Sequence, residues 1–270
     1  MEDTPNKDLQ IQDDLLESIL RRAKLRLLKM HFDSGVGHLG GNLSALDLLL
    51  TLYHRVLERD DQFVLSKGHA AGALYTTLWS VGRLSEERLK EFHKDHTHLA
   101  GHPVPNGIED ILFATGSLGH GLGLASGLAL GKRLQGRSGR VFCLLSDGEW
   151  NEGSTWEALA FLSHHHLTNL TCIVDLNGLQ GFGSTAEVLN LDPLTCKLRE
   201  FGVEVLEING HDPTAIANAL KHPLGDRPIV IVARTVKGHG VSFMENKMEW
   251  HYLPLTAELY QRAVEEVGRA

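Results

Sequence analysis

Apolar residues recur along the chain in two alternating patterns. Over residues 14–31 they repeat every three or four positions, which predicts an amphipathic helix with Asp14 as its N-cap. A second helix is predicted over residues 43–57, with Ser44 as its cap. Short, mostly apolar runs predict buried strands instead. These strands cover residues 62–65, 140–145, 170–176, 203–208 and 228–233.

Helical patterns separate most of the predicted strands, which favours parallel βαβ units. We therefore expect an α/β fold with an open, mostly parallel sheet and helices on both faces. No internal repeat or low-complexity linker divides the chain, so one domain is expected over residues 13–270, after a flexible tail at residues 1–12. The remaining predicted helices are residues 122–134, 154–164, 213–220 and 257–267, and residues 235–255 are predicted to be irregular.

Two of the predicted strands run into polar turns. Asp147-Gly148 follows one strand, and Asn177-Gly178 follows the next. The carboxyl ends of parallel strands meet at one edge of a sheet, where ligands bind. A carboxylate and an amide oxygen suit Mg²⁺, which completes its coordination with water and phosphate oxygens. The two turns therefore predict half of a magnesium–diphosphate site.

Composition limits the partners and the compartment. The net charge of −8 over 270 residues argues against a nucleic acid or an acidic membrane as partner. It also leaves little positive charge to hold a phosphorylated substrate. The polar start, the lack of any apolar run long enough to span a bilayer and three unpatterned cysteines indicate a cytoplasmic protein with neither a disulfide framework nor a zinc site.

A glycine-rich turn at residues 115–123 precedes a predicted helix. Glycines let the backbone approach a ligand closely, and the free N–H groups at a helix start attract phosphate. A tight turn before a closely packed helix explains the same pattern equally well.

The 16 histidines form the other unusual feature, because several lie beside glycine at predicted turns. His38, His69 and His102 do so, and His251 lies in a similar turn. A neutral imidazole donates or accepts hydrogen bonds and suits proton transfer to sugar hydroxyls. Taken singly, each histidine is more often structural. The run at residues 164–166 ends a helix, is expected to face solvent, and receives no role.

In this order, these features resemble the N-terminal, diphosphate-binding part of transketolase over residues 14–265. The motifs that carry the resemblance are residues 34–41, 63–69, 101–103 and 116–121, the turns at Asp147 and Asp175–Gly178, and His251. The resemblance implies thiamine diphosphate as cofactor. It also implies transfer of a two-carbon ketol unit from a ketose phosphate to an aldose phosphate.

The resemblance assigns roles residue by residue. Asp147, Asn177 and the backbone carbonyl of Leu179 would ligate Mg²⁺, with Ca²⁺ or Mn²⁺ as alternatives. His69 and His251 would reach the diphosphate and the reacting centre, while His38 and His102 would contact the donor sugar and stabilise charge on the ketose oxygen. All four histidines are thus expected to be catalytic. The implied cofactor contacts are His69, Gly116, Ser117, Leu118, Gly148, Glu149, Asn177 and His251. Glu152 would be a buried glutamate of a subunit-contact network.

Four positions depart from the family pattern. Ser146 replaces a glycine before the metal aspartate, and Leu176 replaces a residue that is often Asp or Asn. Neither change removes a ligand. His120 replaces a glutamine, which would alter contacts to cofactor or acceptor, and Leu39 replaces a proline after His38.

A full transketolase is more than twice as long, so the resemblance implies the first subunit of a split enzyme that is inactive alone. The expected partner is a C-terminal subunit carrying the pyrimidine-binding domain, in an α2β2 heterotetramer acting on sugar phosphates. That partner would carry the arginines that hold substrate phosphates.

Other interpretations remain open at this stage. A related thiamine-dependent enzyme would load a carrier protein, act on a sulfo-sugar or branched sugar, or serve as the α subunit of a keto-acid dehydrogenase. The histidines favour polyhydroxylated donors over keto acids. A non-catalytic alternative is a nucleotide-binding protein built on residues 116–123, or a regulatory half-transketolase.

Overall fold

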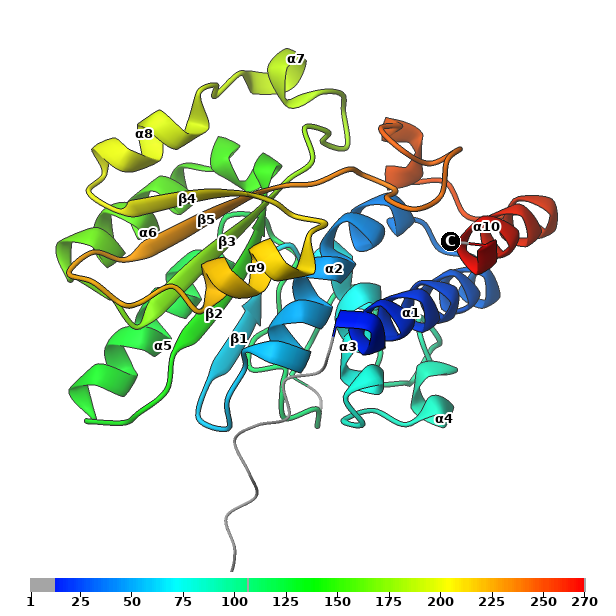
Figure 1. Ribbon diagram of the computed structural model, residues 1–270, viewed down its shortest axis with the longest axis horizontal. Coiled ribbons are helices and arrows are strands. Elements are labelled where there is room, and N and C mark those ends of the chain that lie inside the picture. Colours follow the sequence, from blue (N-terminus) through cyan, green and yellow to red (C-terminus); the bar gives the residue numbers. More distant parts are fainter. Residues whose placement is uncertain (1–12, 106, 270) are drawn as a thin grey trace, which may run out of the picture.

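Five parallel strands form the centre of the computed structural model, which describes residues 13–105 and 107–269. The spatial order is β1-β2-β3-β5-β4, and every neighbouring pair is parallel (Figure 1). The predicted α/β class with an open parallel sheet is confirmed. The strands are β1 (Gln62–Leu65), β2 (Val141–Ser146), β3 (Leu170–Leu176), β4 (Glu204–Asn209) and β5 (Ile229–Arg234).

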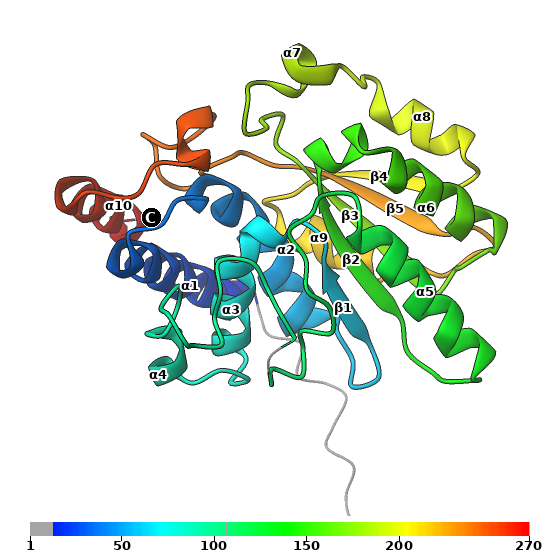
Figure 2. The same ribbon diagram turned by 180° about the vertical axis from the view of Figure 1, so that it is seen from behind.

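Helices cover both faces of the sheet (Figures 1 and 2). Because side chains alternate along a strand, Leu144 and Leu145 of β2 point into opposite layers. The Leu144 layer packs against α1 (Asp13–Ser34), α2 (Leu39–Arg55), α3 (Ala71–Ser80), α9 (Pro213–Leu220) and α10 (Ala257–Arg269). The Leu145 layer packs against α5 (Gly121–Leu134), α6 (Gly153–His164) and α8 (Leu194–Glu200). The short elements are α4 (Glu86–Leu89), α7 (Thr185–Leu189), η1 (Gly68–Ala70), η2 (Asp147–Asn151) and η3 (Met248–His251).

Helix α2 begins earlier than predicted, so the assignment of Ser44 as its cap is wrong. The N-cap is His38, and Ser44 is buried inside the helix, where its hydroxyl donates to Asp175 over 2.6 Å. Gly40 and Gly41 lie in the first turn of α2, and because glycine is a poor helix former the sequence does not indicate that the helix begins there. They fit because other groups pack against them: a Cβ on Gly40 would lie 3.0 Å from Cγ of Lys237. Asp14 likewise lies inside α1, which begins at Asp13.

The candidate site lies at the carboxyl edge of the sheet. The carboxyl ends of β1, β2 and β3 form this edge together with the loop that follows β5. η1 follows β1, η2 follows β2, and residues 177–184 follow β3. Ser146 and Asp175 are register partners, so the two predicted turns do lie side by side.

No helix in the described residues is long and apolar enough to cross a membrane. The predicted tail at residues 1–12 lies outside the described residues.

Candidate functional site

A cavity of about 210 Å³ opens at this carboxyl edge. It brings together most of the residues singled out from the sequence. His38, His69, His102, Gly116, Leu118, Asp147, Gly148, Asn177, Leu179 and His251 all line it. Ser117 and Glu149 are not among its lining residues.

Four imidazoles form one wall of the cavity. The ring of His38 lies 5.9, 5.8 and 5.0 Å from the rings of His69, His102 and His251, measured between centroids. Burial lowers the pKa of each ring: well below its ordinary value for His69, and to about 3 for His251, where Lys237 lies nearby. The four rings are therefore neutral at pH 7 and act as hydrogen-bond donors and acceptors.

The backbone around His38 holds this wall in place. His38 has φ of 64°, an unfavourable region for a non-glycine residue, and its N–H donates to the carbonyl of His251 over 3.0 Å. The amide of Asn42 donates to the carbonyls of His38 (2.8 Å) and His69 (3.0 Å). Asn42 thus ties two histidine loops together, a role that no sequence motif indicated.

Oxygen atoms form the floor of the cavity. The carboxylate of Asp147 accepts the N–H groups of Gly148 (2.8 Å) and Gly178 (2.7 Å), which leaves further acceptor positions on each oxygen. Asn177 and Leu179 follow β3 beside it. Burial, with the Asp175 carboxylate nearby, raises the pKa of Asp147 to about 6. A floor of carboxylate, amide and carbonyl oxygens fits Mg²⁺ or Ca²⁺ and not a softer metal.

A backbone cradle adjoins the oxygen floor. Gly116 has φ of 142°, and a Cβ there would lie only 2.8 Å from Cδ2 of His102. Glycine is therefore required where this loop meets the histidine wall. A phosphate group here would approach the backbone of Gly116 and Gly148, which both line the cavity, and would compete with Asp147 for the N–H of Gly148.

Glu149 lies fully buried beneath the cavity and joins three segments. Its carboxylate accepts the hydroxyl of Ser66, the N–H of Gly119 (3.1 Å) and the N–H of Ser146 (2.8 Å). This is an orienting role. Glu152, in contrast, is exposed in the single chain, so its predicted burial would require another chain.

Lys237 is a site residue that sequence reasoning missed. It is buried, lines the cavity, and its Nζ lies 3.2 Å from both the carbonyl oxygen of Leu179 and Nδ1 of His251. Burial, reinforced by the nearby Lys67 ammonium, lowers the pKa of Lys237 to about 8. Its position in an irregular segment gave no signal beyond the glycine that follows it.

Some predicted features lie away from the cavity. The side chain of His120 is exposed at the N-cap of α5 and does not line the cavity. His164 and His166 are exposed, as expected, while His165 is half-buried against Phe161. Leu39 is buried as the first residue of α2.

A cluster of Asp47, His211 and His239 has ligand atoms within 4.8 Å of one another. The hydrogen bonds of His211 argue against a metal there. Its Nε2 accepts the N–H of Val236 over 2.8 Å, so Nδ1 carries the proton that it donates to Asp47 over 2.6 Å. Both ring nitrogens are already occupied.

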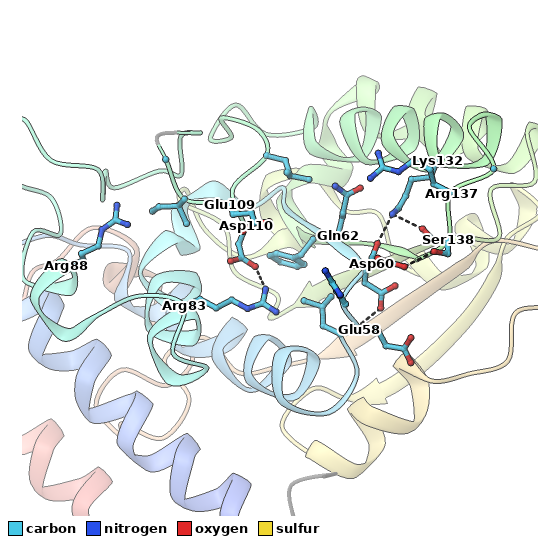
Figure 3. Close-up of a pocket in the computed structure, with 18 residues that line it drawn as sticks. Glu58, Asp60, Gln62, Arg83, Arg88, Glu109, Asp110, Lys132, Arg137 and Ser138 are labelled. Carbon is cyan, nitrogen blue, oxygen red and sulfur yellow. Dashed lines mark hydrogen bonds and ion pairs between the residues drawn. The ribbon is translucent and has the colours of Figure 1, made fainter. Parts of the chain in front are cut away.

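A larger cavity of about 1170 Å³ lies at the amino ends of β1 and β2 (Figure 3). Several of its charged side chains are engaged with their neighbours: Arg83 pairs with Asp110, and Lys132 donates to the carbonyls of Asp60 (2.6 Å) and Ser138 (2.9 Å). None of the residues predicted to be functional lines it.

Residues 23–269 match the family described as transketolase, thiamine diphosphate binding domain. The chain belongs to the transketolase family. The resemblance expected from the motifs is therefore confirmed, and the domain is the thiamine diphosphate-binding one.

Two relatives within the transketolase family match almost end to end. One subunit of the apulose-4-phosphate transketolase of Actinobacillus succinogenes is 37% identical over 257 residues, covering 91% of this chain and 92% of that protein. The 6-deoxy-6-sulfo-D-fructose transketolase subunit SqwG of a Clostridium species is 36% identical over 246 residues, with coverages of 87% and 90%. Both relatives are thus named as single subunits of a transketolase.

A solved transketolase has the same fold. The transketolase from Campylobacter jejuni superposes with a TM-score of 0.89 at 29% identity, covering 96% of this chain and 43% of that one. The structural match thus involves less than half of the longer transketolase chain.

Proposed function

We propose that this chain is the cofactor-binding subunit of a two-chain transketolase that moves a two-carbon ketol unit from a ketose phosphate to an aldose. One observation carries the proposal: the cavity combines four neutral imidazoles with an oxygen floor and a glycine cradle. The family supplies the cofactor class, and the imidazoles suit a substrate rich in hydroxyl groups.

The oxygen floor would hold the metal. Its ligands would be Asp147, Asn177 and the carbonyl of Leu179, and Mg²⁺ is the proposed ion, with Ca²⁺ or Mn²⁺ as substitutes that share its preference for oxygen. The cofactor diphosphate would accept hydrogen bonds from the N–H of Gly116 and, in place of the Asp147 carboxylate, from the N–H of Gly148. Ser117, Leu118 and Glu149 would contribute to that loop geometry from beside or beneath it.

When bound, thiamine diphosphate supplies a nucleophilic carbon that takes up and releases the two-carbon unit. His69, His251 and Lys237 would face the diphosphate side. His38 and His102 would donate hydrogen bonds to the donor sugar and to charge developing on the ketose oxygen. Since the rings are neutral, each presents one ring nitrogen as a hydrogen-bond acceptor and the other as a donor to substrate hydroxyls.

Exposed apolar side chains at the cavity mouth support a partner chain. Phe182 is 86% exposed and Tyr252 54% exposed, and both line the cavity. Large apolar groups left in water at a site often mark an interface. The proposed partner is a C-terminal subunit that brings the pyrimidine-binding domain, in a cytoplasmic α2β2 assembly in which Glu152 becomes buried.

The sugar is proposed to be a specialised one, because the relatives that match end to end are named for apulose 4-phosphate and 6-deoxy-6-sulfo-D-fructose. The imidazole wall recognises hydroxyls and leaves the distinguishing substituent to the partner chain. Branched and sulfonated ketoses therefore belong in the substrate panel beside ordinary ketose phosphates.

Mixing the purified chains tests the proposal. This chain and its partner are assayed separately and together, with thiamine diphosphate and Mg²⁺, across ketose donors and aldose acceptors. Ketol transfer is expected only from the mixture. Turnover by this chain alone would contradict the two-chain proposal, and binding of NAD or ATP in place of thiamine diphosphate would contradict the cofactor assignment.

A further inference from the structure

A buried ion pair lies directly beneath the oxygen floor. Lys67 and Asp175 pair through Nζ and Oδ2, and the side chains of both are fully excluded from solvent. Lys67 also donates to the carbonyl of Gly41 over 3.1 Å. The pair joins the end of β1, the start of α2 and strand β3.

Asp175 collects donors on both carboxylate oxygens. Oδ2 accepts from Lys67 and from the hydroxyl of Ser44 (2.6 Å), while Oδ1 accepts from the hydroxyl of Thr235. The fourth donor is the side-chain amide of Asn177, whose Nδ2 lies 3.4 Å from Oδ1. The ion pair is thus in contact with one of the proposed metal ligands.

This contact fixes which way the Asn177 amide faces. A carboxylate only accepts hydrogen bonds, so the amide must turn its NH₂ group toward Asp175. Its oxygen then faces the other way, where the N–H of Leu179 donates to it over 3.2 Å. The oxygen is the atom that a divalent metal requires.

Stability alone is a weak explanation for the ion pair. Taking two charges fully out of water carries a large desolvation penalty, and apolar replacements of such pairs are often neutral or stabilising. Apolar side chains at these two positions could not orient a metal ligand by hydrogen bonding, whereas the ion pair can.

We propose that Lys67 and Asp175 are a positioning pair that holds the Asn177 amide oxygen toward the divalent metal. Asp175 acts on the amide, and Lys67 offsets the buried charge of Asp175. This inference rests on the proposed function, since it assumes a metal bound at Asp147 and Asn177.

Metal affinity in the assembled two-chain enzyme tests the inference. Mn²⁺ is titrated in the presence of thiamine diphosphate, and free Mn²⁺ is followed by electron paramagnetic resonance. In the double variant Lys67→Met/Asp175→Asn the side chain at 175 becomes an amide that donates as well as accepts, so it satisfies either orientation of Asn177. We expect Mn²⁺ affinity to fall about tenfold, the lower range for residues that orient metal ligands.

Asp47→Asn is the matched control, because Asp47 is also a buried carboxylate that pairs with a basic group, three residues beyond Ser44 on α2. It is expected to lower the melting temperature without changing Mn²⁺ affinity. If the double variant does not fold, Asp175→Asn alone is measured against the same criterion. Lys67→Arg, which retains the charge, is expected to recover part of the affinity.

The outcomes separate this inference from the proposed function. If the wild-type complex binds no Mn²⁺ with thiamine diphosphate, the proposed function and the positioning pair both fail. If the wild type binds and the double variant binds equally well, only the positioning pair fails. An equal loss in Asp47→Asn would also overturn it, because the effect would then be general destabilisation.

Discussion

At the carboxyl ends of the strands the cavity encloses about 210 Å³, whereas the cavity at the amino ends encloses about 1170 Å³. The larger one is lined by five acidic and five basic side chains, and its best-defined pairs already satisfy each other. The smaller one presents neutral imidazoles and acceptor oxygens. Volume alone therefore does not indicate the candidate site. The neutral imidazoles and acceptor oxygens that converge on the smaller cavity do.

The strongest test of this contrast compares one aspartate from each end. Asp147→Ala is expected to abolish metal-dependent binding of thiamine diphosphate in the assembled enzyme, because it removes the one carboxylate of the oxygen floor. Isothermal titration calorimetry measures the loss. Asp60→Ala, at the amino-end cavity, should leave the affinity unchanged. Retained binding by Asp147→Ala would remove the basis for the site.

A histidine comparison sharpens the role of the imidazole wall. His38→Asn keeps a residue that tolerates positive φ but removes the ring, so kcat/KM should fall about 100-fold while thiamine diphosphate affinity is retained. His120→Asn alters the other histidine that caps a helix at this edge, and it should leave kcat/KM unchanged. An equal loss of kcat/KM in the two variants would show that the imidazole wall has no particular role in catalysis.

The carboxyl-end site should respond to pH because the pKa of Asp147 is raised to about 6 without metal. A divalent metal needs the ionised carboxylate, so its affinity should rise about tenfold from pH 5 to pH 7.

The stability of the metal-free chain should change with pH in the opposite direction. The folded state holds the proton more tightly than the unfolded state, so Asp147 contributes stability at low pH that is lost as pH rises through about 6. Calorimetric titrations and melting curves at several pH values, with and without Mg²⁺, measure both effects.

The smallest effect is expected at the amino-end cavity. Arg83→Ala breaks the ion pair with Asp110, in which the arginine side chain is 44% exposed. Exposed pairs contribute roughly 0–1 kcal/mol, so the melting temperature should change little and ketol transfer not at all. A marked loss of activity would mean that the two ends of the sheet are coupled.

Sequence reasoning located the strand ends well because their signals are local. Four strands are short, largely apolar runs, and Asp147 and Asn177 follow two of them immediately. The predicted burial of the strand at residues 203–208 is wrong, because β4 is an edge strand that carries two glutamates and is only partly buried. Sequence reasoning missed α3 because residues 71–80 are nearly all buried and show no amphipathic period. It misplaced the start of α2 for a related reason, since glycine is a poor helix former unless close packing requires it.

The supporting residues of the site were not predictable, because long-range contacts define them. Ser44 and Asp175 are separated by 131 positions, and Lys67 and Asp175 by 108. Lys67 lies within the motif at residues 63–69, but nothing local indicates that its side chain is buried against Asp175. Similarly, Lys237 reaches the cavity only because its loop folds back over α2, where the N–H of Gly238 donates to the carbonyl of Gly40 over 2.9 Å.

The amide of Asn42 has a consequence for engineering. It donates to the carbonyls of His38 and His69, and its own oxygen accepts the N–H of Ala73 over 2.7 Å, so one side chain sets two loops and a helix start. Changes in the two loops are therefore not independent, and variants of the residues beside His38 and His69 should be made and tested together.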